Sequence, residues 1–106
     1  MSLTCGHVFD GAKYVGVEFW HEKDFSISFS CPERSLKDTK ELFSQLASGK
    51  RESIEFEDWN SFGIIELKEE EMVSFSLSKY TKQGTVEVNL SLPLTICLPM
   101  FVFLSE

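Results

Sequence analysis

A chain of 106 residues is long enough for one domain with its own core, and its 42% hydrophobic and 25% charged content excludes wholesale disorder. Its formal net charge of −7, from 17 acidic and 10 basic residues, argues against non-specific nucleic-acid binding, which needs Lys and Arg to displace counterions from phosphates. We therefore expect a single domain over residues 1–106. The charge fits either plain solubility or a basic protein partner.

Three cysteines, Cys5, Cys31 and Cys97, stand far apart, and no secretory leader precedes them. Reduced thiols in the cytoplasm are the simplest interpretation. Cys5 lies two residues before His7, but no second Cys/His cluster follows at zinc-ligand spacing. The sequence therefore predicts neither a metal site nor a cofactor.

The first part of the chain predicts short antiparallel strands. Val8 and Phe9 begin a strand that turns at Asp10-Gly11, a pair suited to tight hairpins. Apolar and polar residues then alternate over 14–20 and again over 25–31, and the polar loop between them contains His21. A general acid or base at His21 is one interpretation, and an ordinary connecting loop is the favoured one.

A helix is predicted after Pro32. Ser35 suits the N-cap, apolar residues from Leu36 to Ala47 follow a helical spacing, and Gly49 suits the C-terminal cap. The apolar stripe of this helix is expected to cover the apolar face of a sheet rather than to bind a partner.

Two further hairpins are predicted after the helix. The first pairs residues 53–59 with 62–67, where Ile64 and Ile65 allow either register. An acidic turn with Glu69, Glu70 and Glu71 leads into the second, over 73–92, where apolar residues alternate with serines and other polar residues. Phe75, Val88 and Leu90 are expected to be core residues.

The tail over residues 94–104 is almost wholly apolar and is interrupted by Pro99. It is too short to cross a bilayer as a helix, since 11 residues would span only about 16 Å. A buried strand over 94–98 with a bend at Pro99 is the favoured interpretation, and a short terminal helix is the alternative. Such an apolar tail is expected to be covered either by its own subunit or by a second one, and the second case would be a homodimer through the tail.

These elements predict an α+β domain. We expect a mostly antiparallel β-meander sheet of about six or seven strands, with one amphipathic helix packed on its apolar face.

The predicted strand over 53–59 places Glu55, Glu57 and Trp59 on one side. An exposed aromatic residue next to charged residues is a common form of interaction hot spot. Burial of Trp59 under the helix or the tail is the alternative, and we favour it slightly. If Trp59 is buried, the acidic turn at Glu69, Glu70 and Glu71 becomes the expected partner-binding surface.

The stretch over residues 46–101 resembles the small acidic bacterial immunity proteins of the WapI kind. The residues that carry this resemblance are Leu46, Gly49, Phe56, Trp59, Gly63, Phe75, Gly84 and Val88. It implies a cytoplasmic domain with a helix before a meander, which neutralises a cognate toxin by binding it. Pro99 departs from the pattern of that family. In the family, the last element is expected to continue as a helix at this position.

The chain has no Gly-rich phosphate loop, nucleophile elbow, metal-binding His pair or Cys-x-x-Cys motif. We therefore expect no catalytic residues and favour a non-enzymatic binding domain, with no nucleic-acid or membrane partner. The alternative is a small-ligand-binding domain or enzyme that uses a pocket between helix and sheet, with His21 or Trp59 at its mouth.

Overall fold

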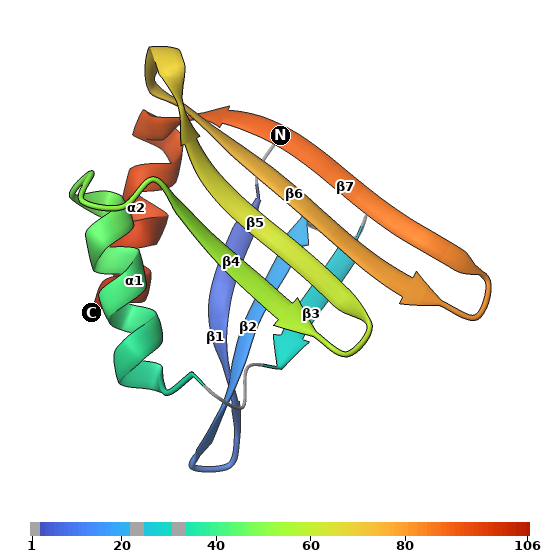
Figure 1. The fold of residues 1–106 in the computed structure, drawn as a ribbon. Helices are drawn as coiled ribbons and strands as arrows, with labels where there is room; N and C mark the ends of the chain where they lie inside the picture. The colour runs from blue at the N-terminus through green and yellow to red at the C-terminus, as the bar shows by residue number, and fades with distance from the viewer. Residues whose placement is uncertain (1–2, 22–24, 31–33) are drawn as a thin grey trace.

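The computed structural model describes residues 3–21, 25–30 and 34–106 (Figure 1). Within these ranges the chain forms seven strands, two α-helices and a short 3-10 turn, η1. Their order is β1 (Thr4–Asp10), β2 (Lys13–His21), β3 (Phe25–Ser30), α1 (Leu36–Ala47), β4 (Ser53–Asp58), β5 (Ser61–Lys68), η1 (Glu69–Glu71), β6 (Met72–Thr81), β7 (Gly84–Pro93) and α2 (Leu94–Ser105). The α+β class and the antiparallel pairing are as predicted.

The strands form two sheets, so the prediction of one sheet with six or seven strands is wrong. One sheet has the order β1-β2-β3 and the other the order β4-β5-β6-β7, with every neighbouring pair antiparallel. The sheets lie over each other, with β4 to β7 in front in Figure 1. Alternation gives each sheet one apolar face, and stacking buries both faces against each other.

Phenylalanine rings join the two layers. Phe19 of β2 lies 5.5 Å from Phe56 of β4 and 6.5 Å from Phe75 of β6, measured between ring centroids. Phe29 of β3 lies 5.8 Å from Phe56. All four rings are buried, and aromatic pairs at such distances add to the energy of apolar burial.

The first helix begins and ends where the sequence predicts. The Ser35 side chain accepts a hydrogen bond of 3.1 Å from the Asp38 N–H, and Gly49 has a φ of 77° after the last turn. However, α1 packs mainly against α2, and its smaller contact with the sheets is chiefly with β4, so the prediction that it covers the apolar face of a sheet is wrong. Phe43 brings the helix into contact with the core, 6.1 Å from Phe56.

The tail is a helix, so the predicted strand and bend at Pro99 are wrong. Cys97, Phe101 and Leu104 recur at helical spacing and are buried, but the surrounding residues are also apolar and hide this period in the sequence. Pro99 removes the donor to the Thr95 carbonyl. Both residues are exposed, so the missing bond lies on the solvent side of α2.

Gly63 determines the register that the sequence left open. It faces the first sheet, and a Cβ atom there would lie 2.8 Å from Cζ of Phe29 and 2.9 Å from Cδ2 of Leu77. Ile65 therefore points inward and is buried, whereas Phe62 and Ile64 point to the other side of the sheet.

The long hairpin is confirmed, with Phe75 directly opposite Leu90 and Leu77 opposite Val88. Phe75 is fully buried, whereas Val88 and Leu90 are only half-buried. Because β7 is an edge strand, its inward side chains have neighbours on one side only. The expectation that all three are core residues is therefore right for Phe75 and too strong for the other two.

Candidate functional site

The outer face of the four-stranded sheet is the side turned away from β1 to β3. Its four strands project these residues outward: Ser53, Glu55 and Glu57 from β4; Phe62, Ile64, Glu66 and Lys68 from β5; Met72, Ser74, Ser76, Ser78 and Tyr80 from β6; Thr85, Glu87, Asn89, Ser91 and Pro93 from β7. All these positions are described, and the basic one among them, Lys68, lies 3.4 Å from Glu66. Unpaired negative charge therefore dominates this face.

Trp59 is 90% exposed, so the slightly favoured interpretation that it is buried is wrong. The last cross-strand pair of this hairpin is Asp58 with Ser61, which makes Trp59 and Asn60 the two residues of the turn. Trp59 therefore lies beyond the alternation that would have directed it to one face, and the large side chain projects from the end of the sheet.

Hydrogen bonds fix the backbone of this turn. The Asp58 carboxylate accepts from the Trp59 N–H at 2.7 Å through Oδ1, and from the Ser30 N–H of β3 at 3.0 Å through Oδ2. The Tyr80 N–H donates to the Asn60 carbonyl at 2.8 Å. The turn that carries Trp59 is thus tied to both sheets.

Two further aromatic residues lie on the outer face at this end of the sheet. Phe62, the second residue of β5, is 41% exposed, and Tyr80 near the end of β6 is 62% exposed. Neither was among the predicted partner-binding residues. Gly63 is the sequence signal for the register that turns Phe62 outward, and Tyr80 faces outward because β6 continues to Thr81.

Glu55 and Glu57 are exposed on β4, as predicted. Glu57 lies directly opposite Phe62 across the β4–β5 pair, and Glu55 lies opposite Ile64. The structure thus brings Glu55, Glu57 and Trp59 to one region and adds Phe62 to it.

Glu69, Glu70 and Glu71 are exposed but lie elsewhere. They form η1, at the opposite end of β5 from the Trp59 turn (Figure 1). Glu70 and Glu71 have φ angles of 61° and 58°, which are uncommon for residues other than glycine. The six predicted partner-binding residues therefore form two separate groups.

Cys5 and His7 occupy structural positions. Burial, with a smaller contribution from Glu18, raises the pKa of the Cys5 thiol well above its usual value. His7 Nε2 lies 2.8 Å from the Leu104 carbonyl, which can only accept, so this nitrogen carries the proton. Nδ1 then accepts from the Tyr14 hydroxyl at 3.1 Å, and the imidazole joins β1 to the end of α2.

In the ranges that the structure describes, no three or more His, Cys, Asp or Glu side chains gather where they could hold a metal ion. No helix within those ranges has the length and apolar character needed to cross a membrane.

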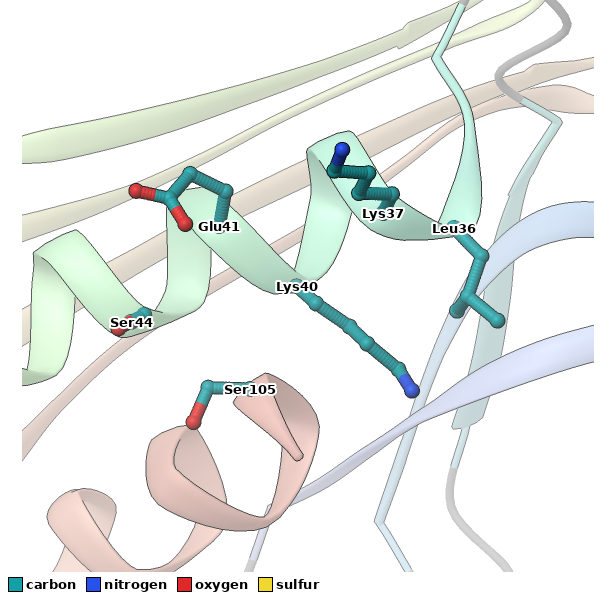
Figure 2. Close-up of a pocket in the computed structure, with 6 residues that line it drawn as sticks. All are labelled: Leu36, Lys37, Lys40, Glu41, Ser44 and Ser105. Atoms are coloured by element: carbon teal, nitrogen blue, oxygen red, sulfur yellow. The ribbon is translucent and has the colours of Figure 1, made fainter.

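A groove of about 400 Å³ lies between α1 and the end of α2, with Leu36, Lys37, Lys40, Glu41, Ser44 and Ser105 around it (Figure 2). It is open and mixed in polarity, and it lies between the helices rather than between a helix and a sheet. Neither His21, which stacks on Phe25 at 6.0 Å, nor Trp59 lines it. The pocket expected for a small-ligand binder is therefore not at this groove.

The chain belongs to the family of unknown function DUF5766, whose match covers residues 26–103. No curated protein and no solved structure matches the chain. The matched region includes the whole four-stranded sheet and both groups of predicted partner-binding residues.

Proposed function

We propose that this chain is a non-enzymatic binding protein that docks onto a basic protein partner through the outer face of its four-stranded sheet. The observation that carries this proposal is Trp59, a 90% exposed tryptophan on a hydrogen-bonded turn. A large aromatic side chain on an ordered backbone can bury much apolar area with little loss of conformational entropy on binding.

The surroundings of Trp59 support the same function. Phe62 and Tyr80 extend the apolar area, and Glu57 lies opposite Phe62 at its border. An aromatic centre with a charged rim is the usual anatomy of a protein–protein interface. Since the unpaired charges here are carboxylates, the complementary partner surface is basic.

The resemblance to immunity proteins of the WapI kind suggests the class of this partner, a toxin that the chain neutralises by covering its basic surface. The widely spaced cysteines fit reduced thiols, and we place this function in the cytoplasm. Catalysis by the chain is not part of this proposal.

A pull-down from the source cell at low salt tests the proposal, with wild type, Trp59→Ala and Phe9→Ala as baits. Phe9 is a matched control because it is also an exposed aromatic residue, near the β1–β2 turn. We expect wild type and Phe9→Ala to capture the same basic protein and Trp59→Ala to lose it. Equal capture by all three baits would remove the proposed surface from consideration.

The exposed side of α2 is a second surface of interest. Folding buries Cys97, Phe101 and Leu104 within the chain, but Ile96 and Phe103 stay 59% and 69% exposed. We keep the homodimer through this tail as a proposal. Sedimentation of wild type and Phe103→Glu over a range of concentrations tests it, since a dimer through α2 should be lost in the variant alone.

A further inference from the structure

The serines that alternate along β6 leave a hollow in the outer face. Phe62, Ser78 and Glu87 lie in one row across β5, β6 and β7. Neighbouring strands are about 4.8 Å apart, so Phe62 and Glu87 stand roughly 10 Å apart, with only the small Ser78 between them. The hollow measures about 160 Å³ and includes Ser76 on its floor and Asn89 on its wall.

The groups around this hollow are complementary to a cation. Phe62 is 41% exposed and offers the face or edge of its ring, and Glu87 provides an exposed carboxylate. The amide oxygen of Asn89 and the serine hydroxyls add neutral acceptors. Lys68, the basic residue among the outward positions of these fully described strands, does not line the hollow, so the structure itself does not neutralise Glu87 there.

Shape favours a guanidinium over an ammonium group. The open hollow of about 160 Å³ has room for a planar group of four heavy atoms. A guanidinium can stack on an aromatic ring and donate in its own plane to a carboxylate. An ammonium is compact and strongly hydrated, and it would fill the same space less completely.

We propose that this hollow is the subsite for one arginine side chain of the partner, with the guanidinium between Phe62 and Glu87. The inference rests on the proposed docking function, to which it adds the chemistry of a single contact. Ser76 and Ser78 are then the floor of a binding site, since any larger side chain at these positions would occupy the space.

Short peptides test this subsite without the partner. Acetyl-Gly-Arg-Gly-amide is titrated into the ¹⁵N-labelled protein, in parallel with peptides in which lysine or citrulline replaces arginine. Citrulline keeps the shape but lacks the charge. We expect the arginine peptide to shift the amide signals of Ser76, Ser78 and Asn89, with an affinity about five-fold above that of either control.

Two pairs of variants locate the contact. Glu87→Gln should weaken arginine binding about five-fold, whereas Glu66→Gln, a carboxylate on the same face but outside the hollow, should not. Ser78→Val fills the floor and should abolish the shifts. Ser74→Val makes the same change on the same face of β6, beyond the hollow, and should leave them intact.

Equal binding of the three peptides, or shifts centred on Glu69 to Glu71 instead of the hollow, would overturn the arginine subsite. This result is distinguishable from failure of the docking function. If peptide binding depends on Glu87 and no protein is captured through Trp59, the subsite stands and the protein partner does not. If Trp59 captures a protein and the peptides do not discriminate, the docking function stands and the arginine subsite does not.

Discussion

At the scale of single residues, Gly63 separates the inner from the outer face of the four-stranded sheet. The space that a Cβ would need is occupied by Phe29 and Leu77 at 2.8 and 2.9 Å. We expect Gly63→Ala to lower the free energy of unfolding by about 1 to 3 kcal/mol, because both neighbours must shift in a packed core. Chemical denaturation measures this change.

A double variant provides the control for Gly63. Leucine at position 29 lacks the Cζ atom that the added methyl group would meet, so Phe29→Leu should relieve part of the strain. The cost of Gly63→Ala should then be smaller in the Phe29→Leu background than in wild type. Equal costs in both backgrounds would mean that the Phe29 contact does not restrict position 63.

The raised pKa of the Cys97 thiol predicts that the protein loses stability in alkali. Burial raises the pKa of this thiol from 9.0 to about 11. Below pH 9 the thiol is protonated in both folded and unfolded chains. Between pH 9 and 11 the unfolded chain loses this proton first, so the free energy of unfolding falls as the pH rises through this interval.

Urea unfolding from pH 8 to 11 measures this effect, with Cys97→Ala as the control. The variant has lost the packing of the sulfur but also its titration, so its stability should fall less steeply across that interval. Parallel curves for the two proteins would show that the Cys97 thiol does not contribute.

At the scale of elements, a central and an edge strand should respond differently to truncation. Phe75 is fully buried on β6, and Val88 is half-buried on β7. Phe75→Ala should cost about 3 to 5 kcal/mol of unfolding free energy through lost burial and a cavity. Val88→Ala should cost on the order of 1 kcal/mol. An unchanged denaturation midpoint for Phe75→Ala would contradict its place in the core.

A substitution at Pro99 tests whether the tail is a helix. Alanine there restores the donor to the Thr95 carbonyl at an exposed position, so Pro99→Ala should raise the free energy of unfolding by about 1 to 3 kcal/mol. Thermal unfolding followed by circular dichroism measures the change. A destabilised variant would instead favour a bend between two extended segments.

The elements differ in how well the sequence predicted them, for identifiable reasons. Alternation in the long hairpin and the cap at Ser35 are local signals, and the structure has both features. In the tail, a uniformly apolar sequence carries no period, so tertiary packing of Phe101 and Leu104 decides for a helix. The division into two sheets depends on which strands fail to pair, and no local pattern contains that information.

The site shows the same limit. Exposure of Glu55 and Glu57 follows from alternation, but Trp59 lies in a turn, where alternation ends. Whether a turn residue is buried depends on which other segments cover the end of the sheet, and no local sequence pattern predicts this. Prediction of the hollow at Ser78 would have required the register across β5, β6 and β7.

At the scale of the whole molecule, the outer face gives a prediction about association rates. Reversing two carboxylates on β4, Glu55→Lys with Glu57→Lys, should slow association with the captured basic partner, because fewer favourable charges steer the encounter. Stopped-flow mixing at low and high salt measures the rates. The difference from wild type should shrink at high salt, and a salt-independent difference would indicate a folding defect instead.

The central claim is that the outer face of the four-stranded sheet, with Trp59 at its end, is the binding surface. Hydrogen–deuterium exchange of the chain alone and with its captured partner tests this claim most directly. We predict added protection in residues 55–62 and 76–89 and unchanged exchange in 94–105. Protection confined to Glu69–Glu71 or to α2, with unchanged exchange around Trp59, would contradict it.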